Sequence, residues 1–523
     1  MKNKSWDAVI VGTGFGGSMV ALRLAAAGMS VLMLERGRKI DRDDSAWDVR
    51  QILVDSKYQS RSPYYFNGKR RRSPFFPNEA IGGNSPFYGG VSFRLRVEDF
   101  KKKSLYGSQD GAKSPYVDWP IKYEDLKSYY DEAEELLGVA GVEGADLFEP
   151  PRDNGYTQSP PPFGFTANMV SDAAKSIGLR PFPIPLAINF RASADREKCV
   201  LCNTCDLFPC KISAKNDLSV TVLPEAVRSG AVIKQEVIAK RLIKSAGRIK
   251  RVECLDLKTG ETFDVSCGLC VVCGGAIESP KLLIASGLDN IKPNGLLIGR
   301  FLMRHVVGIV IGLFPFKTNP ENIFNKQVAI NDFYFGHPES RMPNGPWGVI
   351  QSLQVPPPEY IARYGRFPVG SIGARTTEYH VYLLCIAEDV PNPNNRVKLN
   401  HVKRDIFGLP TAHITHSYCK RDFTVRRALY REAAKILHKA GALIRLRKPV
   451  NTISHACGTC RFGEDPETSV LDPMCNFHGI PNLFVVDSSF MPTSSGVNPS
   501  LTIAANGLRV GKYIAGNWEQ ILK

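Results

Sequence analysis

The chain has 523 residues, of which 43% are hydrophobic, 23% charged and 10% aromatic. This composition is ordinary for globular proteins and excludes a collagen-like, low-complexity or wholly disordered chain. The length predicts two or three domains and a core large enough to enclose a cofactor. A formal net charge of +16 favours anionic ligands or acidic partners. The basic residues are spread along the chain without a DNA- or RNA-reading motif, so we expect no nucleic-acid partner.

The sequence gives no indication of a membrane or export segment. No stretch approaches the roughly 20 consecutive apolar residues that a membrane-spanning helix needs. The first residues lack the apolar segment and small-residue cleavage site of a secretory signal. Thirteen cysteines is an odd number, which argues against the disulfide framework of a secreted protein. We therefore expect a cytoplasmic protein without a membrane span.

A glycine-rich turn near the N-terminus predicts a dinucleotide-binding βαβ unit. A β-branched run at residues 7–11 leads into Gly-x-Gly-x-x-Gly, followed by a helix-forming stretch and a second strand-like run ending at Glu35. Gly12 permits the tight turn, Gly14 lets the backbone approach a pyrophosphate, and Gly17 lets the helix pack closely on the strand. The helix N-terminus favours phosphate binding, and Glu35 stands where a carboxylate accepts hydrogen bonds from a ribose diol. The motif by itself does not separate FAD from NAD.

Four further segments distinguish between these dinucleotides. A glycine-dense loop at 81–94 is followed by segments 270–287 and 299–305 and by a C-terminal block at 455–503. In this order, around one N-terminal nucleotide motif, they resemble the glucose–methanol–choline (GMC) family of flavin oxidoreductases. The resemblance covers both ends and the middle of the chain, and it is thin between residues 310 and 450.

The resemblance implies an α/β fold. A Rossmann-like FAD-binding domain would be combined with a discontinuous α+β substrate-binding domain built on an antiparallel sheet. Strand-like runs at 307–314 and 379–384 support such a sheet. The motif positions predict FAD-binding segments at 1–120, 199–305 and 451–523, and substrate-domain segments at 121–198 and 306–450.

The resemblance also implies a set of FAD contacts. We expect the cofactor to be bound by Gly12, Gly14, Gly17, Glu35, Gly83, Ser85, Val237, Asp487, Asn498 and Pro499. Three residues, Tyr88, Phe462 and Asp289, depart from the residues usual in the family. The change at Tyr88 bears on the contacts at the flavin edge, and whether FAD is linked covalently stays open.

His455 and Asn498 are the candidate catalytic residues. Alcohol oxidation by a flavin needs a group that removes the hydroxyl proton while a hydride moves to flavin N5. An imidazole titrates near neutral pH and suits His455 to this task. The amide of Asn498 can hold the substrate oxygen without titrating. Family members carry a His–His or a His–Asn pair, and Asn498-Pro499 matches the second type.

A cysteine cluster is the second candidate site. Its Cys-x2-Cys-x2-Cys-x4-Cys spacing is partly that of ferredoxins, so the thiolates could hold an iron–sulfur cluster or, less readily, a structural zinc. Two local disulfides or free thiols remain alternatives. The candidate metal ligands are Cys199, Cys202, Cys205 and Cys210.

These observations predict an FAD-dependent oxidase or dehydrogenase that converts a CH–OH group to a carbonyl. The stretch at 178–189 and the loop at 87–90 resemble bacterial members that oxidise sugar or aminoglycoside hydroxyls, which favours a polyhydroxylated small-molecule substrate. An aliphatic or sterol alcohol is the alternative within this class. A flavin subunit that relays electrons through the cysteine cluster is the alternative outside it. The electron acceptor (oxygen, quinone or protein) is left open.

Overall fold

The computed structural model describes residues 5–71, 77–107, 116–192, 196–336, 345–365 and 368–522. Its strands are β1 (Ser5–Val11), β2 (Val31–Leu34), β3 (Tyr64–Phe66), β4 (Lys69–Arg71), β5 (Val139–Ala140), β6 (Phe182–Pro183), β7 (Leu186–Ala187), β8 (Val232–Lys234), β9 (Val237–Ser245), β10 (Arg248–Asp256), β11 (Thr262–Val272), β12 (Val306–Leu313), β13 (Val328–Ile330), β14 (Gly348–Leu353), β15 (His380–Ala387), β16 (Arg396–Arg404), β17 (Pro410–Thr415), β18 (Ile444–Pro449) and β19 (Leu483–Val485). Its α-helices are α1 (Phe15–Ala26), α2 (Lys102–Tyr106), α3 (Glu124–Leu136), α4 (Phe165–Lys175), α5 (Val222–Arg228), α6 (Gly275–Ala285), α7 (Pro358–Tyr364), α8 (Val369–Arg375), α9 (Lys420–Lys439), α10 (Ser500–Gly516) and α11 (Trp518–Leu522).

The larger sheet contains the predicted βαβ unit. Its strands lie in the order β8-β2-β1-β11-β10-β9, and β19 also pairs with β11. Strand β1 is parallel to β2 and to β11, and α1 connects β1 to β2, so the prediction for this unit is confirmed. Strands β9 and β10 add an antiparallel edge. The sheet is mixed, and its parallel strands carry the helices that a Rossmann-like arrangement requires.

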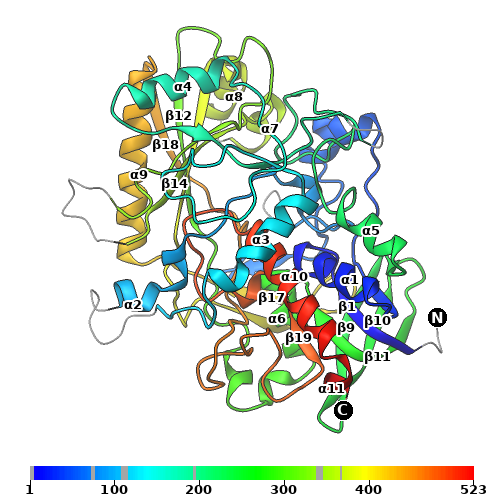
Figure 1. Cartoon of the computed structure of the whole chain (residues 1–523). Coiled ribbons are helices and arrows are strands. Elements are labelled where there is room, and N and C mark those ends of the chain that lie inside the picture. Colours follow the sequence, from blue (N-terminus) through cyan, green and yellow to red (C-terminus); the bar gives the residue numbers. More distant parts are fainter. Residues whose placement is uncertain are drawn as a thin grey trace.

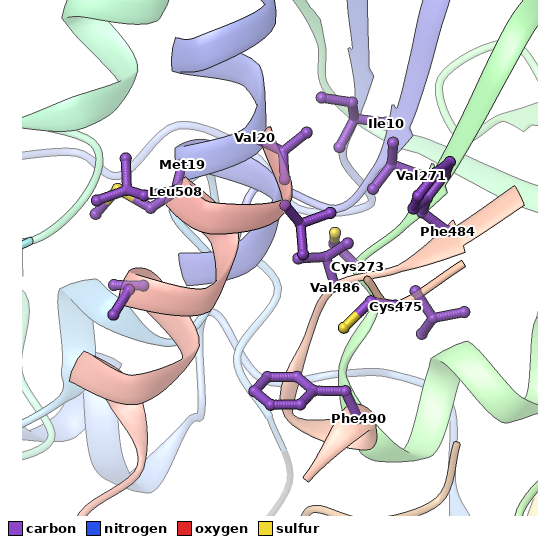
Figure 2. Packing of buried hydrophobic residues seen from close by; sticks show 14 of the residues in the cluster. Ile10, Met19, Val20, Val271, Cys273, Cys475, Phe484, Val486, Phe490 and Leu508 are labelled. Atoms are coloured by element: carbon purple, nitrogen blue, oxygen red, sulfur yellow. The ribbon is translucent and has the colours of Figure 1, made fainter. Parts of the chain in front are cut away.

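Helices from the two ends of the chain pack together on this sheet. The first helix, α1, lies against α10, which follows nearly 500 residues later in the sequence (Figure 1). Two glycines of α10, Gly507 and Gly511, face α1, where an added Cβ would lie about 3 Å from Met19 and Arg23. Figure 2 shows Leu508 of α10 near Met19, in the same buried cluster as strand residues of the sheet. Small residues at this interface therefore allow the two helices to approach closely.

The second sheet is antiparallel and lies in the other part of the molecule. Its order is β18-β12-β15-β14-β13-β6, and β12 pairs with β15 along its whole length. The two strand-like runs expected between residues 307 and 384 are therefore strands of one sheet. Helix α9 packs on one face, over Val310 and Leu383, whereas Ile309 and Ile311 point to the opposite face and line a cavity. Within the described residues, no helix combines the length and apolar character needed to cross a bilayer.

The strands of the two sheets alternate along the chain. Strands of the larger sheet fall between residues 5 and 34, between 232 and 272, and at 483–485. Those of the antiparallel sheet fall at 182–183, between 306 and 387, and at 444–449. On this basis we propose the same five-part division that the motif positions suggest, with boundaries near residues 120, 198, 305 and 450.

The contact of Gly17 with the turn before it gives a test of the packing. A Cβ at this position would lie 2.2 Å from the carbonyl oxygen of Gly12. We expect Gly17→Ala to lower the free energy of unfolding by about 1–3 kcal/mol or more, because the close-packed turn must move. The readout is the thermal midpoint. Gly516→Ala, where the added methyl meets open space at the end of α10, is the control and should be neutral or slightly stabilising. Equal midpoints for the two variants would contradict this account.

Candidate active site

A cavity of about 1770 Å³ joins the glycine loop to the antiparallel sheet. Its wall includes the loop at 12–16, residues from β9 and β11, and the face of β12 and β15 opposite α9. His455 and Asn498 line the same space. Pockets for one small ligand usually occupy about 300–1,000 Å³. This cavity therefore has room for a dinucleotide and a second small molecule.

The glycine loop forms a cradle of the kind that a pyrophosphate needs. Gly12 has φ +102°, and a Cβ there would lie 2.4 Å from the carbonyl oxygen of Cys273, so the turn requires glycine. A Cβ on Gly14 would meet no protein atom within 4 Å and would point into open space. Both residues line the cavity. Gly17 does not line the cavity and makes the close packing contact expected of the third glycine. The loop thus fits a dinucleotide phosphate.

Glu35 holds this loop in place. One carboxylate oxygen accepts hydrogen bonds from the Thr13 amide at 2.9 Å and from its hydroxyl at 2.6 Å. The other oxygen accepts from the Gly37 amide at 2.8 Å. Glu35 lines the cavity with 7% of its surface exposed. A carboxylate offers about four acceptor positions, so a contact to a ribose diol remains compatible with these bonds and stays a prediction.

The other expected cofactor residues differ in their placement. Gly83 has φ +62° and faces Gly14, with an added Cβ 3.1 Å from the Gly14 Cα. Gly83 and Val237 both line the cavity, and the Val237 amide donates to the carbonyl of Glu35 at 2.9 Å. Ser85 is not among the lining residues. Its hydroxyl donates to the Gly82 carbonyl and accepts from the Leu218 amide, so Ser85 supports the glycine-dense loop from behind the wall.

Asp487 joins two segments that border the cavity. One carboxylate oxygen accepts from the Gly275 amide at 2.9 Å and from the Ser279 hydroxyl, both at the start of α6. The other accepts from the Ser489 amide at 2.8 Å. Burial raises the pKa of Asp487 above its ordinary value. Asp487 lines the cavity, and it anchors the loop after β19 to α6.

Three helices begin at the cavity wall. Phe15 starts α1, Gly275 starts α6 and Ser500 starts α10, and all three residues line the cavity. Asn498 and Pro499 line it immediately before α10. Each helix has 11 or more residues. A helix N-terminus presents free N–H groups and a partial positive charge, so this part of the wall favours negative charge on a ligand.

His455 and Asn498 lie next to each other although 43 positions separate them in the sequence. The Asn498 side-chain nitrogen lies 3.4 Å from Nε2 of His455. Asn498 is 8% exposed and His455 is partly buried, and both line the cavity. The amide oxygen of Asn498 accepts a hydrogen bond from Nε2 of Gln351 at 2.9 Å. The two residues predicted as a catalytic pair are therefore brought together at one point of the wall.

The surroundings of His455 favour its neutral form. Burial, the neighbouring His305 and the cation of Lys326 lower the pKa of His455 well below its ordinary value. Nδ1 of His455 lies 3.0 Å from Nδ1 of His305, whose Nε2 lies 2.8 Å from the carbonyl oxygen of Ser494. A neutral imidazole can accept a proton, as a general base must. Burial, which the sequence did not show, thus moves the pKa of this histidine below the near-neutral value of an ordinary imidazole.

Sequence reasoning missed polar residues that other segments bring to the cavity or to the Asn498 amide. Gln351 comes from the middle of β14 and is fully buried. Lys326 forms an ion pair with Asp206 at 3.0 Å, and the second carboxylate oxygen of Asp206 is buried without a hydrogen-bond partner. No local pattern marks these residues, because each belongs to a different loop or strand. His305 was only weakly indicated by the sequence, because it is the last residue of the segment 299–305, one of those that resemble the GMC family.

Within the described residues, the structure gives no support for a metal site at the four cysteines. All are free thiols, and within the described part of the chain no three His, Cys, Asp or Glu side chains are arranged to hold a metal ion. Burial raises the pKa of Cys199 to about 11 and also raises the pKa of Cys205. The iron–sulfur expectation is therefore not supported. The zinc and disulfide alternatives are not supported either, because the described residues contain no metal-binding group and the four cysteines form no disulfide.

Backbone contacts fix the loop that carries the four cysteines. The Cys199 amide donates to the Asn189 carbonyl, and Cys202 pairs with Ile323 in a β-bridge. The Cys205 carbonyl accepts from Lys215 and the Cys210 carbonyl accepts from Arg42. These contacts hold the backbone of the loop at each of the four cysteines.

The departures from the family pattern have structural explanations at two positions. The Tyr88 hydroxyl donates to the Asn216 carbonyl at 2.9 Å, and its ring lies 5.7 Å from that of Phe15 at the cavity wall. Phe462 is buried and packs edge-on against Trp119 and Phe490. Asp289 lies in a short turn outside the lining residues.

Comparison with known proteins agrees with this architecture. Family models described as GMC oxidoreductase match residues 112–307 and 391–507. The chain is 30% identical over 545 residues to paromamine 6'-oxidase of Streptomyces fradiae, covering 98% of this chain and 92% of the relative. It is 27% identical over 557 residues to the fructose dehydrogenase large subunit of Gluconobacter japonicus, covering 99% of each. The structure of pyridoxine 4-oxidase from Mesorbium loti is similar with a TM-score of 0.66, at 19% identity and 99% coverage of both chains. These matches, together with the glycine cradle, show that the chain belongs to the GMC oxidoreductases, the FAD-dependent enzymes that act on CH–OH groups.

Proposed function

We propose that the protein oxidises a CH–OH group of a polyhydroxylated small molecule to a carbonyl, with His455 as the general base. The observation that carries this proposal is the position of the His455–Asn498 pair in the wall of the cavity that also contains the glycine cradle. A base and an oxygen-binding amide thus share one space with the dinucleotide site. Bound FAD would supply the acceptor for the hydride that leaves the carbinol carbon.

His455 would take the hydroxyl proton on Nε2. As the O–H bond breaks, its electron pair forms the carbonyl π bond and expels the hydride from carbon. Nε2 faces Asn498, whose side-chain nitrogen lies 3.4 Å away, so a substrate oxygen bound here would contact both residues. The Asn498 amide would donate to this oxygen as negative charge develops on it. The N-terminus of α10, two residues later, adds a positive dipole at the same place.

Polar residues elsewhere in the cavity support a polyhydroxylated substrate. Lys326, Asp206 and Gln354 all line the cavity, and the buried free oxygen of Asp206 can accept a hydrogen bond from a hydroxyl or ammonium group. Relatives named for paromamine and fructose point to the same class. We infer that these side chains bind the part of the substrate remote from the reacting carbon.

An aliphatic or sterol alcohol is the second candidate. The antiparallel sheet presents Ile309, Ile311, Tyr382 and Leu384 to the cavity, which is an apolar surface suited to hydrocarbon. A panel of sugars, aminosugars, long-chain alcohols and sterols, each tested with oxygen and with dye acceptors, separates the two candidates. Higher kcat/KM for the hydrocarbon alcohols than for every polyhydroxylated compound would reverse our preference.

The first prediction concerns cofactor retention. Gly14 has extended backbone (φ −71°, ψ −172°) that valine adopts readily, and its side-chain direction is open space in the cavity. We expect Gly14→Val to fold but to lose FAD, because the isopropyl group occupies the pyrophosphate position. The flavin-to-protein absorbance ratio of the purified variant measures this. Gly516→Val, also in open space but outside the cavity, should keep a full complement of flavin. Stoichiometric flavin in Gly14→Val would contradict the assignment of the glycine loop as the pyrophosphate-binding site.

The second prediction concerns the base. We expect His455→Ala to retain FAD and to slow flavin reduction by about 10²–10⁴-fold, the usual contribution of a general base. Asn498→Ala should cost less, roughly 10–10³-fold, because it removes one hydrogen bond to the oxygen. Stopped-flow absorbance follows the reduction. His401→Ala, an exposed histidine on β16, is the matched control. If His455→Ala reduced its flavin at the wild-type rate, the base would have to be another residue.

The third prediction concerns pH. Because the pKa of His455 is lowered, the base is unprotonated at neutral pH and becomes protonated only in acid. The rate of flavin reduction should therefore be level around neutral pH and fall as the pH drops, with an apparent pKa below 6.5. This acid limb should be absent from the residual rate of His455→Ala. A limb centred above pH 7 in the wild type would contradict the neutral-base account.

A further inference from the structure

Five groups form a continuous line of hydrogen bonds through the proposed catalytic pair. The carbonyl oxygen of Ser494 lies 2.8 Å from Nε2 of His305, and Nδ1 of His305 lies 3.0 Å from Nδ1 of His455. On the other side, Nε2 of His455 lies 3.4 Å from the Asn498 nitrogen, and the Asn498 oxygen lies 2.9 Å from Nε2 of Gln351. Each contact restricts the proton positions in the next.

The Ser494 carbonyl sets the direction of this line, because a carbonyl oxygen can only accept. Nε2 of His305 must therefore carry a hydrogen. His305 is 1% exposed, and burial lowers its pKa, so the ring is neutral and its Nδ1 holds a lone pair. Nδ1 of His455 must then donate to it. In neutral His455 this leaves the lone pair on Nε2, the atom that faces Asn498.

The amide end agrees with the same direction. A lone pair on Nε2 of His455 accepts from the Asn498 nitrogen, and the Asn498 oxygen then accepts from Gln351. If the oxygen and nitrogen of the Asn498 and Gln351 side chains were exchanged, the Asn498 oxygen would face His455, and Nε2 of His455 would have to carry a hydrogen. Every proton along the line would then shift, and a lone pair of His305 would face the Ser494 carbonyl. The carbonyl at one end thus fixes the orientation of an amide at the other.

We propose that His305 and Gln351 are positioning residues that fix His455 with its lone pair on Nε2 and Asn498 with its N–H group toward the substrate. The proposal rests on the proposed function of His455 as the base. His305 acts on the tautomer of His455, and Gln351 acts on the orientation of Asn498. Gln351 is fully buried and its own amide oxygen has no hydrogen-bond partner, so its nitrogen is the atom that the arrangement uses.

The backbone around the two histidines supports a functional constraint. His305 has φ +61° and His455 has φ +59°, in the left-handed region that residues other than glycine rarely adopt. The two loops are joined by reciprocal backbone hydrogen bonds between Met303 and Cys457, of 3.0 and 2.9 Å. The Tyr418 hydroxyl donates to the His305 carbonyl at 2.7 Å. Unfavourable conformations held by several contacts are typical of functional sites.

Two substitutions of His305 separate positioning from a merely structural role. The oxygen of asparagine can replace Nδ1 and accept from His455, whereas glutamine places its nitrogen near Nε2 and keeps only the contact to Ser494. We expect His305→Asn to reduce its flavin within roughly tenfold of the wild-type rate. His305→Gln should lose at least 10²-fold, because a base held in the wrong tautomer is strongly impaired. Equal rates, or a slower His305→Asn, would overturn the proposal.

Nuclear magnetic resonance gives a readout that does not depend on turnover. In protein with ¹⁵N-labelled histidine rings, the signals of His455, identified by their loss in His455→Ala, should report hydrogen on Nδ1 and none on Nε2. The same pattern should persist in His305→Asn and change in His305→Gln. Hydrogen on Nε2 in the wild type would overturn the proposal even if His305→Gln failed to fold. This measurement of the His455 tautomer remains valid even if His455→Ala shows that His455 is not the base. A failure of the proposed function is therefore distinguishable from a failure of the tautomer proposal.

Double substitutions test whether each residue acts through its partner. Gln351→Met should slow flavin reduction about 10-fold in the wild-type background and have no further effect in Asn498→Ala. His305→Gln should likewise add nothing to His455→Ala. Residues that act through one another are non-additive, whereas independent structural damage accumulates. Additive losses in both pairs would show that His305 and Gln351 support the fold and do not position the catalytic pair.

Discussion

Parallel strands of the larger sheet end at a common edge, and the whole site depends on this edge. The segments that follow β1, β2, β11 and β19 carry the glycine loop, Glu35, the start of α6 and Asp487. Hundreds of residues separate the first two segments from the third, and the third from the fourth. They share a cavity because parallel strands place their carboxyl ends together. The loop of β1 and the end of β19 approach so closely that a Cβ on Gly16 would lie 1.5 Å from the Val486 carbonyl oxygen. The C-terminal catalytic block is thereby fixed against the cofactor cradle.

The electrostatics of His455 follow from where this edge meets the antiparallel sheet. Burial there lowers the pKa of the imidazole, and the neighbours that act on it, His305 and Lys326, lower it further. A carboxylate on Nδ1 would have done the opposite, because it stabilises the imidazolium. The neutral His305 instead orients the ring without adding basicity. The imidazole that we propose as the base is therefore unprotonated at neutral pH and able to accept a proton.

The sequence predicted those features that local patterns determine. The βαβ unit follows from glycines and hydrophobic runs within 35 residues, and β12 and β15 follow from apolar runs. The placement of His455 beside Asn498 came from the family resemblance. The features that the sequence did not predict depend on tertiary contacts between distant segments. The position of Ser85 behind the wall, for example, depends on its contact with the Leu218 amide. Gln351 was invisible because only the sheet register brings it to Asn498.

Strain and packing are balanced at this point of the molecule. His305, His455 and Ser495 all have left-handed backbone, which costs an L-residue about 1–2 kcal/mol each. Ser495 lies between β19, which pairs with β11, and α10, which packs on α1, and reciprocal backbone hydrogen bonds between Met303 and Cys457 join the two histidine loops. A large core can hold such conformations, whereas an exposed loop would relax them. The proposed catalytic pair therefore lies in a cavity wall to which both sheets contribute, and we infer that the contacts that hold the strained histidines also fix the proton positions along their hydrogen bonds.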